Sequence, residues 1–406
     1  MAMQKSRGEK DDVEIKSAIS SSVKDSSVSL LRVISILIIF VVGVVIGLVS
    51  SSHVDRYFTT GEFYSNTKAS AVHIFDDGNC VISMINNNCE KEDCLSMKSF
   101  IRPKILTHGL SDEELFWRAS LVPKKDEFPF YRVPKVAFMF LTRGPLPLLP
   151  LWERFFKGQD KMKYSIYVHA LPGFQLNVTN SSVFCRRQIP SRHVEWGTVS
   201  LVDAEKRLLA NALLDFSNER FVLLSESCIP VYNFSIVYKY LTGSMHSFVQ
   251  SYDDPSRYGR GRYNRRMQPD VKLADWRKGS QWFELNRYFA AIIVADTKYY
   301  SIFKKHCRPS CYPDEHYLPT FFHKFYGAMN ANRTVTYVDW AVTGPHPRTF
   351  SAVNVTEDFI QSIRNNATAC SYNLKQTTNV CYLFARKFTP DALEPLLSLS
   401  SKVMQY

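Results

Sequence analysis

The feature that most constrains this chain is an apolar run between residues 30 and 49. Its seventeen residues Val33–Val49 carry no charged side chain, and that length is just enough to cross a bilayer as a helix. Basic residues are frequent before the run, whereas the next ones after it are Arg56 and Lys68. Because cytosolic flanks are enriched in Lys and Arg, we expect Leu30–Val49 to anchor a single-pass type II membrane protein. A cleaved signal peptide remains the alternative.

Two features of the part after the apolar run agree with a lumenal location. The chain contains nine cysteines, which can pair in an oxidising compartment. The plausible local pairs are Cys307 with Cys311, Cys370 with Cys381, and some combination of Cys80, Cys89 and Cys94. A zinc site is not expected, because the cysteines lack the paired spacing of zinc ligands. Asn-x-Ser/Thr sequons, which are candidate glycosylation sites, occur at Asn177, Asn180, Asn233, Asn332, Asn354 and Asn366.

Composition and patterning divide the chain into four segments. Residues 1–29 are rich in Ser, Lys and Asp and are predicted to be a disordered cytosolic tail. The anchor occupies residues 30–49, and residues 50–130 are predicted to form an irregular lumenal stem. Residues 131–406 then show the regular alternation of a folded domain.

Within that domain, apolar strand patterns alternate with amphipathic helix patterns. Strands are predicted at Lys135–Leu141, Tyr164–Ala170, Phe221–Leu224, His246–Gln250, Phe289–Val294, Thr334–Asp339 and Cys381–Ala385. Helices are predicted at Leu151–Phe156, Ser200–Asp215, Pro313–Phe325 and Pro390–Leu397, the last of them capped by Thr389. This alternation predicts an α/β fold around a mainly parallel sheet. Ligands in such folds bind beyond the carboxyl ends of the strands.

The charge balance limits the partners of this domain. The net charge of +12 favours a polyanionic partner or a phosphate-bearing substrate. Nucleic acid is not expected in the lumen, and no zinc finger, aromatic ribonucleoprotein signature or helix-turn-helix pattern is visible. The lumenal part also lacks Asp-x-Asp, which could supply a divalent-metal clamp for a diphosphate. We therefore expect no metal or other cofactor, and Lys or Arg in its place.

Several candidate residues could serve either in function or only in structure. Glu315 lies at the start of a predicted helix. It could act there as a general base, or it could only stabilise the helix through the favourable interaction of its negative charge with the helix dipole. Trp282, beside Ser280 in a Gly-Ser turn, could stack on a sugar ring or pack in the core. Arg262 belongs to the basic segment Gly259–Arg266, which is either a solvated loop or a loop that faces an acceptor.

Other candidates follow the predicted strands. Arg143 and His169 end the first two strands, although a lone His is more often structural. Lys387 follows the last strand, where it could meet a phosphate or remain solvated, and the same alternatives apply to Arg364. Trp340 follows the strand near residue 338.

The segment from Pro134 to Phe388 resembles the core-2/I-branching β-1,6-N-acetylglucosaminyltransferases, especially their plant-type relatives (glycosyltransferase family 14-like). The resemblance is carried, in order, by KVAFMFLTR at 135–143, SIYVHALPG at 165–173, residues 194–214, FVLLSESCIPV at 221–231, GSQWFELNR at 279–287, YPDEHYL at 312–318 and CYLFARKFTP at 381–390. It implies a GT-A-like nucleotide-sugar-binding fold. It also implies an inverting, metal-independent, Golgi-membrane glycosyltransferase that uses a UDP-sugar and a glycan or glycoprotein acceptor.

The resemblance also assigns roles to individual residues. It implies that Glu315 is the catalytic base, that Arg364 and Lys387 replace a metal at the diphosphate, and that Trp340 stacks on the acceptor. His169 stands where animal members have an Asp that meets the nucleoside, so UDP-N-acetylglucosamine is only the default donor. Because the Gly-x-Asp-Phe-Pro segment of those members is also replaced, at residues 226–230, an inactive glycan-binding or scaffold protein of the same fold remains the alternative.

Overall fold

A computed structural model describes residues 37, 39–43, 106–121, 130–308, 311–342, 344–365, 369–373 and 376–406. The chain divides into two units, Met1–Phe75 and Asp76–Tyr406, and in the first of them residues 39–43 are helical. No helix among the described residues is both long and apolar enough to span a membrane. Most of the expected anchor Leu30–Val49, the tail and most of the stem lie outside the described residues, so the segment boundaries remain predictions.

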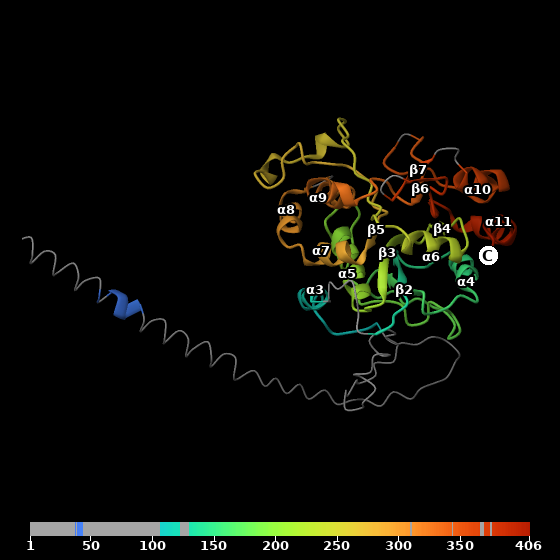
Figure 1. Ribbon diagram of the computed structural model, residues 1–406, viewed down its shortest axis with the longest axis horizontal. Coiled ribbons are helices and arrows are strands. Elements are labelled where there is room, and N and C mark those ends of the chain that lie inside the picture. Colours follow the sequence, from blue (N-terminus) through green and yellow to red (C-terminus); the bar gives the residue numbers. More distant parts are fainter. Residues whose placement is uncertain are drawn as a thin grey trace, which may run out of the picture. The chain divides into compact units, whose positions relative to one another are not determined.

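A four-stranded sheet organises the second unit (Figure 1). Its order is β2-β1-β3-β5, with bounds Tyr164–His169 for β2, Lys135–Leu141 for β1, Asn218–Ser225 for β3 and Glu284–Asn286 for β5. β1 runs parallel to β2 and to β3, whereas β5 is antiparallel to β3. The mainly parallel sheet expected from the sequence is therefore present.

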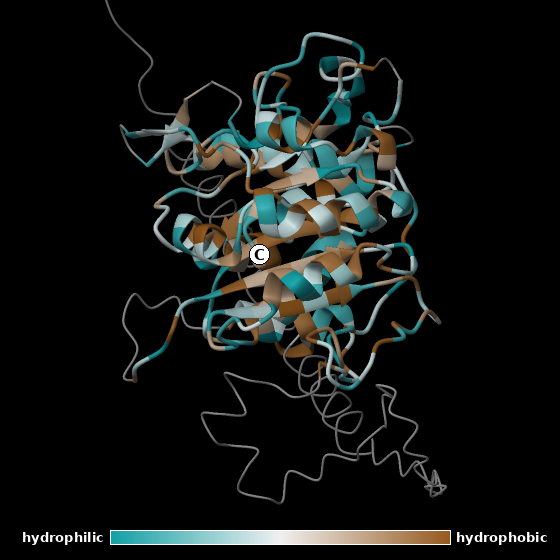
Figure 2. Cartoon of the chain, turned by 90° about the vertical axis from the view of Figure 1, so that its right-hand side faces the viewer, coloured by the Kyte–Doolittle hydropathy of each residue, from teal (hydrophilic) through white to brown (hydrophobic). Residues whose placement is uncertain are grey.

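Side chains of β1 alternate between two apolar cores, one on each face of the sheet. Ala137, Met139 and Leu141 pack in the core that contains residues of α3 (Asp112–Ser120), α5 (Ser200–Leu213) and α7 (Arg287–Ala295). The even-numbered residues Val136 to Phe140 join the core of α4 (Leu149–Phe156) and α6 (Phe234–Thr242). Every residue of β1 is buried, as expected for a parallel strand covered on both faces. Figure 2 shows these strands as hydrophobic ribbon enclosed by mixed helices.

A second, smaller sheet is formed largely by the C-terminal part of the chain. Its order is β4-β9-β6, formed by Ile229–Pro230, Phe384–Arg386 and Thr336–Val338. The hairpin of β7 (Cys370–Tyr372) and β8 (Gln376–Thr378) and the helices α10 (Glu357–Arg364) and α11 (Leu393–Leu399) complete this part. The helices α8 (Lys298–His306) and α9 (Tyr317–Phe325) follow β5 and α7 in the chain. Short helical turns lie at Arg260–Arg262, Arg265–Met267, Pro313–Glu315, Gly327–Met329, Ala352–Asn354, Pro390–Ala392 and Ser400–Met404.

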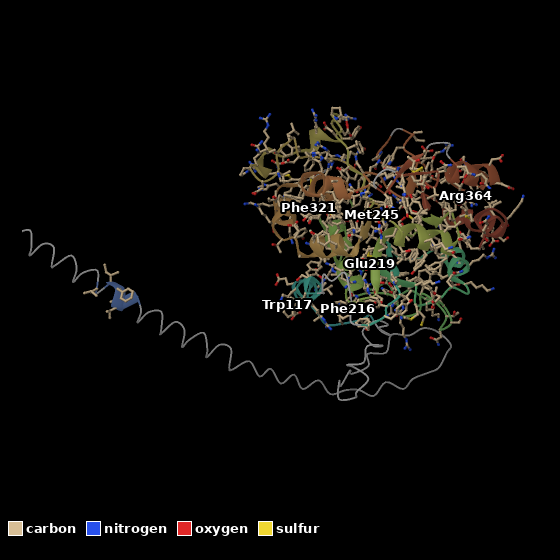
Figure 3. All side chains as sticks on the ribbon, in the orientation of Figure 1. Trp117, Phe216, Glu219, Met245, Phe321 and Arg364 are labelled. Atoms are coloured by element: carbon tan, nitrogen blue, oxygen red, sulfur yellow. A yellow bond between two sulfur atoms is a disulfide. The ribbon has the colours of Figure 1, made fainter. Side chains whose placement is uncertain are left out.

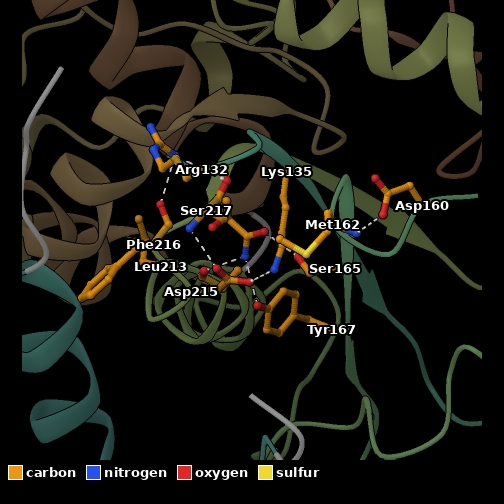
Figure 4. A network of polar contacts seen from close by, with 12 residues as sticks. Arg132, Lys135, Asp160, Met162, Ser165, Tyr167, Leu213, Asp215, Phe216 and Ser217 are labelled. Carbon is orange, nitrogen blue, oxygen red and sulfur yellow. Dashed lines mark hydrogen bonds and ion pairs between the residues drawn. The ribbon is translucent and has the colours of Figure 1, made fainter. Parts of the chain in front are cut away.

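Buried polar contacts lock the start of β1 to the connection between α5 and β3 (Figure 4). Lys135 Nζ donates to Asp215 Oδ2 at 2.7 Å, and both side chains are at most 2% exposed. The Ser217 amide donates to the other oxygen of Asp215 at 2.8 Å. Buried charges are tolerated only when they are paired in this way, so the contact fixes where the central strand begins.

Three expectations from the sequence are wrong or only partly met. Residues 289–294 form part of helix α7, because the side chain of Asn286 accepts from the Phe289 amide as a helix cap and a short apolar run does not distinguish a strand from a helix. Residues 246–250 make only isolated bridges. Thr389 does not cap the last helix, since its hydroxyl bonds Asp391 and the Phe350 carbonyl.

The two local disulfides expected at the C-terminal side are both present. Cys307 is bonded to Cys311, and Cys370 is bonded to Cys381. The first closes the loop between α8 and the turn Pro313–Glu315, and the second closes the β7–β8 hairpin. Cys80, Cys89 and Cys94 lie outside the described residues.

Candidate functional site

A large cleft opens at the carboxyl ends of the strands. Its volume is about 1670 Å³. The residues that follow the strands line it: Thr142 and Arg143 after β1, Glu226 after β3, Trp340 after β6, and Lys387 after β9. This is the edge at which ligands bind in α/β sheets, and the sequence named Arg143, Trp340 and Lys387 among these positions.

Seven of the nine predicted catalytic and binding residues line this cleft: Arg143, Arg262, Ser280, Trp282, Glu315, Trp340 and Lys387. They come from strand ends, from the loop before β5, and from the short turn that precedes α9. The structure therefore brings together residues that are as far as 244 positions apart in the sequence.

The backbone around Glu315 is held from several sides. Tyr312 adopts a left-handed conformation, with φ of 53°, and the turn Pro313–Glu315 follows it directly. The Gly279 amide donates to the Glu315 carbonyl at 2.9 Å. A Cβ on Gly279 would lie only 1.8 Å from the Gln250 carbonyl oxygen, so this close approach requires glycine. The next residue, His316, stacks on Trp276 with ring centroids 4.4 Å apart.

Two cations contact the carboxylate of Glu315. Arg262 Nη1 lies 2.7 Å and Lys278 Nζ 3.7 Å from the same oxygen, Oε2. The Arg262 guanidinium also lies over the ring of Tyr312, 4.1 Å from its centroid. The Glu315 side chain is 21% exposed, so it reaches the cleft while its charge is balanced. Because both cations approach Oε2, the other oxygen is the one available to accept a proton.

Two further carboxyl groups lie buried behind Glu315. Burial, and then the neighbouring Glu315, raise the pKa of Asp314 to about 7. Burial, and then Asp314, raise the pKa of Glu205 on α5. Gln281 donates to Glu205 Oε1 at 2.9 Å, whereas Asp314 Oδ1 and Glu205 Oε2 have no hydrogen-bond partner among the described residues. A carboxyl group that is buried in this way is favoured in its protonated form.

A second group of cations lies at the strand ends. Unlike the cations at Glu315, its members form no ion pair with an acid that the structure describes. These strand-end cations are Arg143, Arg386 and Lys387. Burial, and then Arg386, lower the pKa of Lys387, while Glu226 opposes the shift and Arg143 adds to it. The pKa shifts thus show that the three cations and Glu226 are close enough to interact. Preplaced cations of this kind can stabilise a phosphate or another anion.

The aromatic residues of the cleft differ in how much ring they expose. Trp340 is 54% exposed and Trp196 is 47% exposed, so both can receive a flat apolar ligand face. Trp282 is only 6% exposed, and the Arg386 guanidinium covers its ring at 4.1 Å. This corrects the expectation that Trp282 stacks on a sugar, because its ring face is already occupied and supports Arg386 instead.

The structure does not bring His169 into the cleft. The side chain is 1% exposed, and its Nε2 lies 3.1 Å from Arg207 Nη1. Burial, and then Arg207, lower the pKa of His169 to about 4, so the ring is neutral near pH 7. Arg207 in turn pairs with Asp112 at 2.6 Å. His169 therefore belongs to an internal polar network rather than to the donor site.

The structure also corrects the placement of Arg364. This residue ends helix α10, where Figure 3 labels it. It is not among the residues that line the cleft. Its guanidinium lies over Tyr232, 4.5 Å from the ring centroid, and its carbonyl accepts from the Tyr232 hydroxyl at 2.9 Å. The resemblance assigned this residue from its spacing to Lys387, but the β7–β8 hairpin lies between the two residues, and only Lys387 lines the cleft. Arg386, the direct neighbour of Lys387, lines the cleft instead.

The sequons differ in exposure. Asn177, Asn180 and Asn332 are exposed, whereas Asn233 and Asn354 are half-buried. The side-chain oxygen of Asn233 caps α6, and that of Asn354 accepts from Ser351. Asn366 lies outside the described residues.

Two residues of the cleft, and one that is buried behind it, were not expected from the sequence. Arg386 was passed over because only its neighbour matched an expected pattern, although both follow the same strand. Trp196 lies in a loop without regular pattern. Glu205 is buried on helix α5 beside the buried Lys206 and Arg207, and its charged neighbours in the sequence gave no sign of this burial.

Comparison with known proteins places this geometry in a family. The sequence model described as "Core-2/I-Branching enzyme" matches residues 136–364. Glycosyltransferase BC10 of Oryza sativa subsp. japonica is 38% identical over 311 residues, which cover 66% of this chain and 76% of that protein. The mixed α/β fold with a mainly parallel sheet fits a GT-A-like glycosyltransferase. Among the described residues, no group of three or more His, Cys, Asp or Glu is arranged to hold a metal. The chain belongs to the core-2/I-branching enzyme family and is a glycosyltransferase.

Proposed function

We propose that this enzyme transfers a sugar, N-acetylglucosamine by default, from a UDP-sugar to a hydroxyl of a glycan or glycoprotein, with inversion at the anomeric carbon. One observation carries the proposal: Glu315 and the strand-end cations line the same cleft. A carboxylate that can take a proton and cations that can meet a departing diphosphate are the two requirements of such a displacement.

In the proposed reaction, the acceptor hydroxyl attacks C1 of the donor sugar. Its proton passes to the free oxygen of Glu315, and the bond from C1 to the diphosphate breaks with its electron pair on UDP. A positioned general base typically contributes about 10²- to 10⁴-fold in rate. Arg262 and Lys278 hold the carboxylate ready by contacting its other oxygen.

The leaving diphosphate would meet Lys387 and Arg386, with Arg143 beside them. Burial, and then the neighbouring Arg386, lower the pKa of Lys387, and a bound diphosphate would relieve the repulsion between the two cations. This arrangement supports charge neutralisation by side chains without a divalent ion. Arg386 takes the role that the resemblance had assigned to Arg364.

Trp340 is proposed to stack on the acceptor, since it lines the cleft and is more than half exposed. Ser280 lines the same region and would offer a hydroxyl to it. We further propose a Golgi location with the domain in the lumen. The apolar run Leu30–Val49 and the basic residues before it support that topology.

The experiment is a donor and acceptor panel with the full-length chain. We expect UDP release that depends on one UDP-sugar and rises when a glycan acceptor is present, with an inverted linkage in the product by NMR. A chain that binds glycans but releases no UDP from any donor would instead be the inactive binding protein, and would contradict the proposal.

A further inference from the structure

The cleft carries more positive charge than a donor diphosphate requires. Nine Arg and Lys residues line it, against four Asp and Glu residues. One of those four, Asp314, is buried, and its pKa of about 7 leaves it largely without charge below neutral pH. The strand-end cations account for three of the nine, and Arg262 and Lys278 are paired with Glu315.

The remaining four cations are all arginines: Arg257, Arg265, Arg266 and Arg308. We call them the arginine rim. All four are exposed, and none forms an ion pair with an acid that the structure describes. Arg257 instead lies over the ring of Tyr258, 4.8 Å from its centroid. These guanidinium groups therefore face the cleft with unused charge.

Some nearby cations outside the cleft are paired with acids. Arg260 pairs with Asp253 in the same basic segment. Lys298 lies 2.6 Å from Asp270, and Lys324 lies 2.9 Å from Asp275. Acids in this region thus compensate three cations outside the cleft, whereas Lys272, Lys304 and Lys305, which also lie outside it, form no ion pair with a described acid. What distinguishes the rim is that its four unpaired arginines converge on one cleft, an arrangement that suits an anion.

The rim is separate from the strand-end cations. Besides burial, Lys305, Arg266 and Arg308 lower the pKa of His306, so the rim lies against the end of α8. The charged groups that influence Lys387 are Arg386, Glu226 and Arg143, which belong to the strand ends. Glu315, through its contact with Arg262, lies on the rim's side of the cleft. An anion held by the rim would therefore approach the base rather than the leaving group.

Exposed rings beside the rim favour a sugar chain over a peptide as the carrier of that anion. Trp196 is 47% exposed and packs against Tyr312, with ring centroids 5.0 Å apart. Tyr258 is 50% exposed next to Arg257. Arg257 and Arg262 already lie over the ring of Tyr258, so the open ring in this part of the cleft is that of Trp196. An open aromatic face in a cleft with unpaired guanidinium groups suits a pyranose ring that carries a carboxylate, because Arg binds carboxylates with two parallel hydrogen bonds.

We propose that the acceptor of this enzyme is an acidic glycan, whose uronic-acid carboxylates bind the arginine rim while a neighbouring hydroxyl reaches Glu315. This proposal rests on the proposed transferase function and names the acceptor class of the same cleft.

The test compares binding of oligogalacturonate and of its fully methyl-esterified form to the full-length chain by calorimetry. The two probes share a backbone, and the ester replaces each carboxylate charge by a neutral methyl ester. We expect the acidic form to bind at least about tenfold more tightly and to weaken with salt. Equal binding of the two forms would overturn the proposal.

A variant with Arg257→Ala, Arg265→Ala and Arg266→Ala should lose that preference. The matched control, Lys157→Ala with Lys161→Ala and Lys239→Ala, removes three exposed charges outside the cleft and should keep it. Loss in both variants, or in neither, would contradict a specific site. An oligoglutamate peptide that competes as well as oligogalacturonate would instead identify an acidic-peptide acceptor and overturn the glycan assignment.

UDP affinity, measured on the same wild-type preparation, separates this proposal from the function on which it rests. A chain that binds UDP but does not distinguish the two probes refutes the acidic acceptor alone. A chain that does not bind UDP refutes the transferase proposal and the acceptor class with it.

Discussion

The two ends of the cleft use the same positive charge in opposite ways. At the strand ends, Arg143, Arg386 and Lys387 make no ion pair with a described acid, and mutual repulsion contributes to the lowered pKa of Lys387. At the other end, Arg262 and Lys278 both contact Glu315. An unpaired cation group is prepared for an incoming anion, whereas a paired one holds a carboxylate in place. The difference indicates a leaving-group end and a base end within one site.

The sharpest way to break this comparison is Glu315→Gln. The amide keeps the size of the side chain but cannot take a proton, so we expect transfer to fall by about 10²- to 10⁴-fold while UDP binding stays unchanged. The matched control is Glu195→Gln, another carboxylate of the cleft, which should change transfer only slightly. Transfer by the Glu315 variant above a tenth of wild type would refute its role.

The leaving-group end is tested by Lys387→Ala. Loss of one charge-assisted contact to the diphosphate should weaken UDP binding by about tenfold to a hundredfold, measured by calorimetry. Arg364→Ala serves as the control, since its guanidinium lies over Tyr232 outside the cleft. The assignment fails if both variants bind UDP like wild type, or if the Arg364 variant alone loses affinity.

The buried carboxyl behind the base predicts how stability depends on pH. The folded-state pKa of Asp314, about 7, lies above its usual value of 3.8, so the folded state holds the proton longer than the unfolded state. The stabilisation that the protonated Asp314 contributes to the folded state is therefore fully present below about pH 4 and is lost as the pH rises through 7. Asp314→Asn should remove this loss and raise the free energy of unfolding at pH 8 by roughly 1–3 kcal/mol relative to wild type. In thermal melts, the gain in stability of the variant over wild type should be larger at pH 8 than at pH 5. An equal gain at both pH values would show that the carboxyl titrates normally.

The smallest expected effect concerns divalent ions. Because three cations already stand at the strand ends, we expect transfer in excess EDTA to remain within about twofold of the untreated rate. Loss of activity with EDTA and its recovery with Mn²⁺ would show that a metal assists the leaving group and would remove the contrast between the two ends.

Much of the fold could be predicted because its strongest elements carry local patterns. Lys135–Leu141 is apolar on both faces, and the structure buries all of it between two helical layers. The helix predicted at Ser200–Asp215 ends within two residues of the observed one. Residues 289–294 could not be assigned correctly, since their apolar run fits either element and only the cap at Asn286 decides it.

The site was predictable where function follows a strand end or a short motif. Arg143, Glu315, Trp340 and Lys387 were named from such positions and all line the cleft. Arg364 was named from spacing along the chain, which does not measure distance in the fold. The basic segment Gly259–Arg266 marked part of the arginine rim in the sequence. That Arg308 joins this rim, and that Asp314 is buried, depends on segments that meet only in three dimensions.

The most direct test of the two-ended site is an experimental structure of the chain with bound UDP. We predict that the diphosphate contacts Lys387 and Arg386, and that Glu315 keeps its contact with Arg262 on the far side of the sugar position. A diphosphate bound instead by Arg257, Arg265 or Arg266 would contradict the assignment of both ends.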